Sequence, residues 1–164
     1  MFRTRILPAS LLSALFVLAL GGFLPDPVAS HFDASGVRNA FASRASVVAI
    51  MALTASLVPA LMWLLPACLI RVRSGAFVNL PNRELWFSPE HVGATRAFLD
   101  RHFARFSYAL NLFFCYAFAL VVQANREAGG RLSSSALLMG EAVLLGYLVL
   151  WLVRLYRRFS SGTD

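Results

Sequence analysis

Four stretches of the chain are almost entirely apolar, without the recurring polar face that surface helices of soluble proteins show. Each stretch has at least 19 residues, enough for an α-helix to cross a hydrocarbon core of about 30 Å. Glu141 is the single acidic or basic side chain within them. The predicted transmembrane helices are residues 6–24, 45–70, 106–124 and 132–153. The pattern therefore predicts an all-α polytopic membrane protein, in which residues 1–164 form a single membrane domain.

The composition leads to the same class of protein. Hydrophobic residues make up 59% of the 164 residues, charged residues make up 14%, and the mean hydropathy is +0.67. Soluble domains carry about 25% charged residues. A soluble fold of this size would leave about a third of its surface exposed, and much of that surface would have to be apolar. Intrinsic disorder is excluded by the same composition, and two cysteines are too few for a disulfide scaffold.

The positive charge predicts an orientation. All fifteen basic residues are arginines, and the formal net charge is +7. With the N-terminus inside, eleven arginines flank the spans or lie in the loop on the cytoplasmic side, and four lie in the outer loops. This asymmetry predicts that both termini are cytoplasmic, with an outer loop at 25–44 and an inner loop at 71–105. Topology thus explains the charge, and no basic stripe interleaved with aromatic residues indicates nucleic-acid binding.

The first apolar stretch has an alternative interpretation as a secretory signal. Basic residues precede the apolar run, and the small residues Val28-Ala29-Ser30 follow it, as in a cleavage site. The run is longer than the usual apolar region of a signal, which favours a retained transmembrane helix.

The inner loop contains a predicted amphipathic helix. Ser88-Pro89-Glu90 is typical of a helix start, with Ser as the cap, Pro in the first turn and Glu near the positive end of the dipole. The apolar positions that follow recur at helical spacing: Val92, Leu99, Phe103 and Phe106. Two arrangements fit this pattern. The helix either lies on the inner membrane surface and runs into the third span, or packs against the other helices as ordinary core.

Two loop segments carry a resemblance to a known family. Residues 24–39, LPDPVASHFDASGVRN, have a proline followed by His-Phe, a glycine and an amide. Residues 80–90, LPNRELWFSPE, have a Pro-Asn-Arg element followed by Trp. These segments resemble a membrane domain of unknown function that is also found at the N-terminus of SdpI-type toxin-immunity proteins. The resemblance implies a small multi-pass protein of the bacterial cytoplasmic membrane, without established catalytic chemistry or cofactor. The implied motif residues are His31, Phe32, Asp33, Gly36 and Asn39 in the outer loop, and Pro81, Asn82, Trp86, Pro89 and Glu90 in the inner loop.

Several ionisable groups of the outer loop lie close together in sequence. His31 and Asp33 are two residues apart, and Asp26 precedes them, so the group is a candidate for cation binding or for titration near neutral pH. A metal site usually takes three or four ligands, and His91 and His102 are expected on the other side of the membrane. We therefore predict no metal site. The favoured role is structural, tying a turn before Gly36 through local hydrogen bonds, and ligand or toxin recognition is the alternative.

Polar residues inside the spans are the remaining candidates. A charged carboxylate near the bilayer midplane is costly, so Glu141 must face the bundle, stay protonated or find a partner. Tyr116, Thr54 and Ser56 are expected at similar depth. The functional interpretation is a proton- or cation-binding site, and the structural one is a neutral acid that hydrogen-bonds between helices. Asn111 is expected to form an interhelical hydrogen bond.

Three hypotheses of function follow. The sequence lacks a glycine-rich phosphate loop, a His-Glu-x-x-His motif, a Cys-x-x-Cys motif and a nucleophile elbow, which argues against an enzyme. The favoured hypothesis is a non-enzymatic inner-membrane protein with a binding, immunity or envelope-stress role. The alternatives are a small proton- or cation-coupled transporter or sensor using Glu141, and an accessory subunit of a membrane complex. The expected partners are the lipid bilayer and a peptide, toxin or membrane protein, with a homo-oligomer as a further option.

Overall fold

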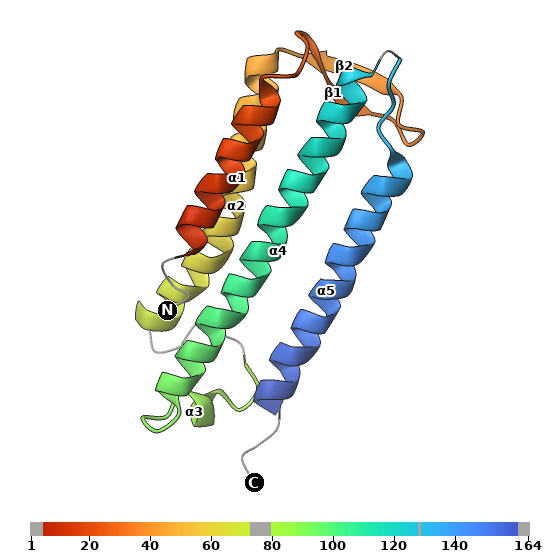
Figure 1. Cartoon of the computed structure of the whole chain (residues 1–164). Coiled ribbons are helices and arrows are strands. Elements are labelled where there is room, and N and C mark those ends of the chain that lie inside the picture. The colour runs from red at the N-terminus through yellow and green to blue at the C-terminus, as the bar shows by residue number, and fades with distance from the viewer. Residues whose placement is uncertain (1–4, 73–79, 128, 161–164) are drawn as a thin grey trace.

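The computed structural model describes residues 5–72, 80–127 and 129–160, and it is mostly helical, with about 75% of the described residues in helices. Four long helices lie side by side, and a β-hairpin covers one end of them (Figure 1). The elements in chain order are α1 (Ile6–Gly21), β1 (Val28–Phe32), β2 (Arg38–Ala42), α2 (Arg44–Val72), α3 (Arg83–Trp86), α4 (Val92–Arg126) and α5 (Ser134–Ser160).

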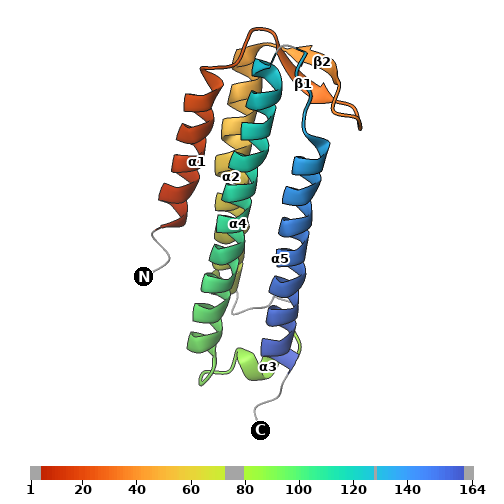
Figure 2. The same cartoon turned by 45° about the vertical axis from the view of Figure 1, so that its right-hand side comes forward.

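The long helices alternate in direction. The hairpin joins α1 to α2 at one end, the connection from α4 to α5 lies at the same end, and the short helix α3 lies at the opposite end (Figures 1 and 2). Helices α1, α2 and α4 pack against one another, and α5 packs mainly along α4. The start of α1 and the end of α5 therefore lie at the end of the bundle opposite the hairpin.

Three helices are long and apolar enough to cross a membrane, namely α2, α4 and α5. Few residues of their most apolar windows are buried within the chain, and in α5 none is. Apolar side chains thus cover the outside of the bundle, which suggests membrane insertion. Helix α1 is apolar but shorter, with 16 residues, and its leucines are exposed to a similar degree. Three of the four predicted spans therefore have the required length and composition.

The predicted amphipathic helix and the predicted third span are a single 35-residue helix, α4. It continues straight through both regions rather than bending at their junction (Figure 2). The predicted start at Ser88 is wrong, because α4 begins at Val92. The Ser88 hydroxyl lies 3.0 Å from Nδ1 of His91 and caps no backbone N–H, so residues 88–91 form a turn. Part of the inner loop, residues 73–79, lies outside the described residues.

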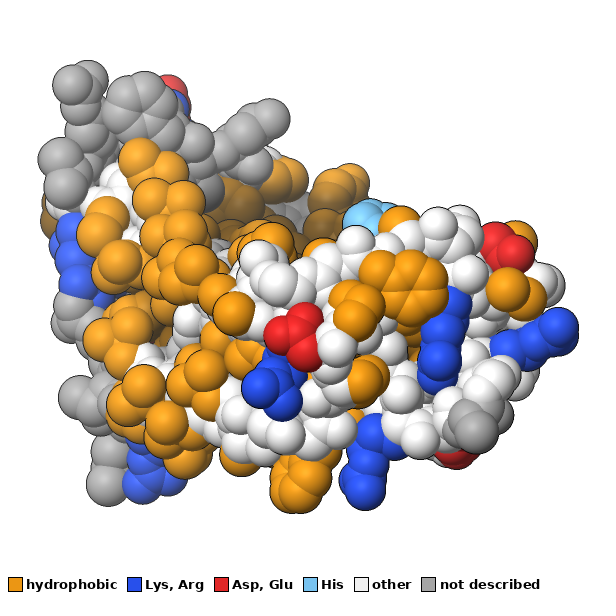
Figure 3. Space-filling view, turned by 90° about the horizontal axis from the view of Figure 1, so that it is seen from above, with side chains coloured by type: hydrophobic (Ala, Val, Ile, Leu, Met, Phe, Trp, Pro, Cys, Tyr) orange, Lys and Arg blue, Asp and Glu red, His pale blue; other side chains and the backbone are white. Residues whose placement is uncertain are grey.

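The all-α prediction missed the hairpin. Strands β1 and β2 pair antiparallel, with Val28 opposite Ala42 and Phe32 opposite Arg38, and the register is irregular around His31. Five-residue strands are too short to give a clear alternating pattern, so the segment had the sequence character of a loop. Seen from this end, acidic and basic side chains lie among polar ones, and hydrophobic side chains gather on one side of the view (Figure 3).

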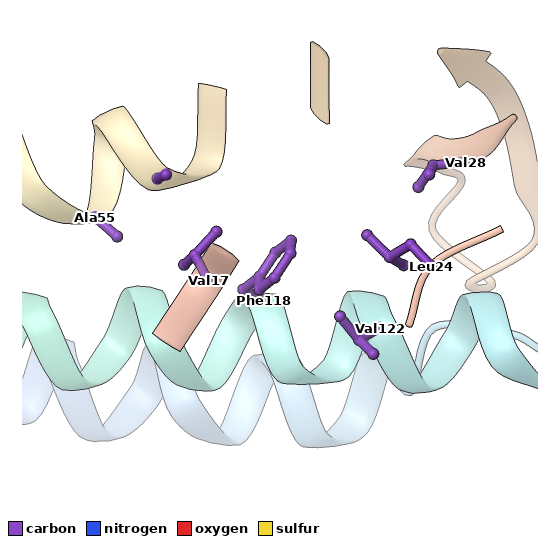
Figure 4. Packing of buried hydrophobic residues seen from close by; sticks show 7 residues of the cluster. Val17, Leu24, Val28, Ala55, Phe118 and Val122 are labelled. Carbon is purple, nitrogen blue, oxygen red and sulfur yellow. The ribbon is translucent and has the colours of Figure 1, made fainter. Parts of the chain in front are cut away.

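The core below the hairpin is built at the meeting of α1, α2, α4 and β1. Its buried members are Val17, Leu24, Val28, Ala52, Ala55, Phe118 and Val122 (Figure 4). The small residues Ala52 and Ala55 let α2 approach closely, so the ring of Phe118 fills the space between helices. Helix α1 approaches α2 closely at Gly21, where a Cβ would lie 2.5 Å from a methyl group of Val48. Because Val28 of β1 belongs to this core, the core also packs the hairpin against the helices.

Candidate functional site

The turn of the hairpin is organised by one carboxylate. Oδ1 of Asp33 accepts hydrogen bonds from the Ser35 hydroxyl at 2.7 Å, from the Ser35 N–H at 2.9 Å and from the Val37 N–H at 2.9 Å. The Ser35 hydroxyl and the Val37 N–H lower the pKa of Asp33 below its ordinary value of 3.8. Asp33 thus forms the local hydrogen bonds expected in the turn before Gly36. His31 does not tie the turn, because its Nδ1 lies 3.1 Å from the hydroxyl of its neighbour Ser30.

Gly36 joins this turn to the connection between α4 and α5. Its φ of +80° is left-handed, and a Cβ there would collide with the carbonyl oxygen of Leu132. In return, the Leu132 N–H donates to the Gly36 carbonyl at 3.0 Å. Two residues further along each segment, the Ser134 hydroxyl donates to the Ala34 carbonyl at 3.2 Å. Glycine is thus required here both by the backbone conformation and by the close approach of the second chain segment.

Two side chains bind the hairpin to the end of α4. Asn125 pairs with the buried backbone of Ala29: its Oδ1 accepts the Ala29 N–H at 2.8 Å, and its Nδ2 donates to the Ala29 carbonyl at 3.2 Å. Arg38 donates from β2 to the carbonyls of Ala124 and Glu127. Because these bonds satisfy buried or helix-terminal backbone groups, they hold the hairpin in one position on the bundle.

The outward side of the hairpin carries the motif residues. The side chains of His31, Asp33 and Asn39 are exposed, and Phe32 is half-buried. The neighbouring Phe41 on β2 is 58% exposed. The expected cluster of Asp26, His31 and Asp33 does not form: Asp26 accepts the Arg44 N–H at 3.1 Å instead, and no group of three such side chains converges among the described residues.

The inner-loop motif is anchored by Trp86, which is 2% exposed. Its indole N–H donates to the Phe159 carbonyl at 3.1 Å, and its own carbonyl accepts the Thr95 hydroxyl at 2.8 Å. The guanidinium of Arg158 lies 4.3 Å from the centroid of the Trp86 ring. Trp86 therefore joins α3 to the start of α4 and the end of α5.

The other inner motif residues have different positions. Asn82 precedes α3 with a left-handed φ of 51°. The side chains of Pro81, Asn82, Pro89 and Glu90 are exposed. A small buried cluster of Ile70, Trp86, Leu99 and Phe159 lies beneath them. Because Leu99 contributes to this cluster, the start of α4 packs against other helices, the second of the two arrangements that its pattern predicted.

Three of the polar residues within the bundle hydrogen-bond to nearby groups. The Ser13 hydroxyl of α1 donates to Oδ1 of Asn111 at 2.8 Å, which confirms the expected interhelical hydrogen bond. The Tyr116 hydroxyl donates to the Ala136 carbonyl at 2.6 Å, so it is not available to Glu141. The Ser56 hydroxyl bonds to carbonyls of its own helix. Glu141 is half-buried and makes no hydrogen bond or ion pair with any described residue.

Sequence reasoning missed the residues that tie the ends of the bundle together. Asn125 lies just beyond the predicted third span, and the sequence gives no sign of its partner 96 residues away. His102 was considered only as a metal ligand, yet its ring is 1% exposed and stacks between Phe98 and Trp151. The spacing of Arg154, Arg157 and Arg158 does place these residues near one another on a helix surface. This spacing could have predicted a basic patch at the end of α5.

Comparison with known proteins gives one family. No curated protein and no solved structure matches the chain. The family match described next covers residues 9–55 and does not include the inner-loop segment 80–90. Residues 9–55, which hold most of α1, the hairpin and the first part of α2, match a family described as a domain of unknown function (DUF1648), in agreement with the resemblance of residues 24–39.

Proposed function

We propose that this chain is a non-enzymatic, four-span protein of the bacterial cytoplasmic membrane, whose hairpin is a fixed recognition surface for a peptide or protein partner. The observation that carries the proposal is the contrast within the hairpin. Its backbone is bonded to α4 through Asn125 and to the following connection through Gly36, while the side chains of His31, Asn39 and Phe41 are exposed. A preorganised surface binds with less loss of conformational entropy than a mobile loop.

The chemistry of the surface favours a polypeptide partner. The exposed ring of Phe41 offers a large apolar contact, and the exposed His31 and Asn39 of the same hairpin offer hydrogen-bonding groups, a combination that protein-binding surfaces use. Protection against a membrane-active peptide, as the resemblance to immunity proteins implies, is one form of such recognition, and a response to envelope stress is another.

A growth assay tests this function. Cells expressing the wild type, His31→Ala, Phe41→Ala or His91→Ala at equal levels are challenged with membrane-active peptides. His91→Ala is the matched control, since it removes the same side chain at the opposite end of the bundle. We expect protection to be lost in the two hairpin variants and kept in the control. Equal protection by all four proteins, or none by the wild type, contradicts an immunity role.

Direct recognition is tested by cross-linking in living cells. A photoreactive residue at position 41 is expected to give a discrete polypeptide adduct that His31→Ala abolishes. The same residue at position 112, where Leu112 is 74% exposed on the apolar side of α4, serves as the lipid-facing control. The absence of an adduct at position 41, together with normal growth of the hairpin variants, overturns the recognition surface.

Glu141 separates this proposal from the transporter alternative. The variant Glu141→Gln keeps the shape of the side chain but can no longer take up or release a proton. Recognition by the hairpin predicts a normal phenotype for this variant at every external pH, whereas proton coupling predicts a pH-dependent defect. Among the described residues Glu141 makes no hydrogen bond or ion pair, whereas ion sites of transporters usually combine several polar groups.

The topology is tested by cysteine labelling in a background with Cys68 and Cys115 replaced by serine. We expect an impermeant maleimide to label Ala34→Cys in intact cells, and Ser160→Cys only after permeabilisation. Arg5→Cys decides the number of spans: it behaves like Ser160→Cys when α1 crosses the membrane, and like Ala34→Cys when it does not.

A further inference from the structure

Two open cavities follow each other between α4 and α5. The first is an apolar groove of about 660 Å³, whose walls include Tyr108, Leu112, Val143 and Leu144. The second, of about 850 Å³, lies toward the α3 end. Arg105 and Tyr147 line both, so the two cavities adjoin, and we call them together the α4–α5 cleft.

The cavity toward the α3 end is basic, and we call it the basic end of the α4–α5 cleft. Its lining includes four arginines: Arg105, Arg154, Arg157 and Arg158. None of the described residues that line either cavity is acidic. A guanidinium binds phosphate oxygens through paired N–H groups, and several of them around one cavity favour an anionic group.

Stacked aromatic rings hold α4 and α5 together beside the basic cavity. The His102 ring stacks between Phe98 at 5.1 Å and Trp151 at 4.3 Å, measured between ring centroids. The Trp151 indole N–H donates to the His102 carbonyl at 2.9 Å and so fixes α5 to α4 at this level. The cation–π contact between Arg158 and Trp86 holds one wall. The arginines therefore surround a preformed space.

The apolar groove of the α4–α5 cleft has about the length of one membrane leaflet. From Arg105 to Tyr116 along α4, the rise is about 16 Å. Half of a hydrocarbon core is about 15 Å. An apolar groove of this length beside a basic cavity matches the acyl chain and the negative headgroup of a lipid.

We propose that the α4–α5 cleft binds an anionic phospholipid, with its phosphate among the arginines of the basic end and an acyl chain along the apolar groove. Basic pockets between transmembrane helices bind such headgroups in general. A free phosphate would leave the groove unused, and a helix of a second copy would bring no evident anion for the arginines. The proposal rests on membrane insertion, and it does not depend on recognition by the hairpin.

The test is lipid binding to the purified full-length chain in detergent, measured by native mass spectrometry. Phosphatidylglycerol and phosphatidylcholine with identical chains are the probes. The double variant Arg105→Gln/Arg154→Gln is compared with Arg83→Gln/Arg131→Gln, which removes the same charge from exposed positions outside the cleft. We expect phosphatidylglycerol binding to fall about 30-fold in the first variant, and to change less than about twofold in the control. Unchanged phosphatidylcholine binding shows that the first variant is folded.

Other outcomes overturn the proposal. Equal binding of the two lipids, or equal losses in the two double variants, removes the basis for a headgroup site. Displacement of phosphatidylglycerol by millimolar inorganic phosphate assigns the arginines to a soluble anion. A dimer that Val143→Trp dissociates, without any bound lipid, assigns the cleft to an interface between copies.

Discussion

Replacing Asn125 with alanine tests whether the hairpin is held by the end of α4. The variant leaves the buried N–H and carbonyl of Ala29 without their partner, because the side chain supplies both hydrogen bonds. Each buried backbone group that loses its hydrogen bond costs about 1–3 kcal/mol. With partial relaxation, we expect the hairpin to lose about 2–4 kcal/mol of local stability, which corresponds to about 30- to 700-fold more frequent opening.

Hydrogen exchange followed by mass spectrometry, with the protein in lipid nanodiscs, measures this opening directly. We expect faster exchange in peptides covering β1, while α2 and the middle of α4 keep their protection, since the core of Val17 and Phe118 is untouched. Gln123→Ala is the matched control: it lies in the same helix turn, is exposed, and bonds only to Glu127. Unchanged exchange in β1, or an equal increase in the control, would refute the role of Asn125.

Three further results are expected. Gly36→Ala should lower the midpoint of thermal unfolding more than Gly129→Ala, because both residues have positive φ but only Gly36 faces a neighbouring backbone within 4 Å; equal shifts would show that the close approach carries no cost. Trp86→Phe should cost about 1 kcal/mol through the lost bond to the Phe159 carbonyl, and Trp86→Ala about 3–5 kcal/mol, in thermal unfolding with detergent; a smaller effect of the alanine variant would contradict its anchoring role. The pKa of Asp33 is lowered below 3.8, chiefly by a serine hydroxyl, so the carboxylate's contribution to the turn is complete above that pH and is lost as the pH falls through the lower folded-state pKa; backbone NMR signals of the turn should follow this transition in the wild type and not in Asp33→Asn.

The sequence by itself determined the long helices of this protein. An apolar run of about 20 residues has few alternatives to a helix that faces lipid, because its backbone must satisfy its own hydrogen bonds there. The turn around Asp33 and Gly36 was also predictable, since an acidic side chain bonds the backbone two residues on and glycine adopts positive φ without strain. Both features depend on neighbours in the sequence.

Contacts between distant segments decided the rest. Asn125 meets Ala29 across 96 residues, and Trp86 meets Phe159 across 73. Four of the arginines counted for topology also line one cavity, because α5 packs along α4 in a particular register. Hydrophobic periodicity shows which face of a helix is apolar, but not which neighbour covers it or at what height. Packing alone therefore determined that the hairpin is fixed to the bundle and that the α4–α5 cleft joins an apolar groove to a basic end.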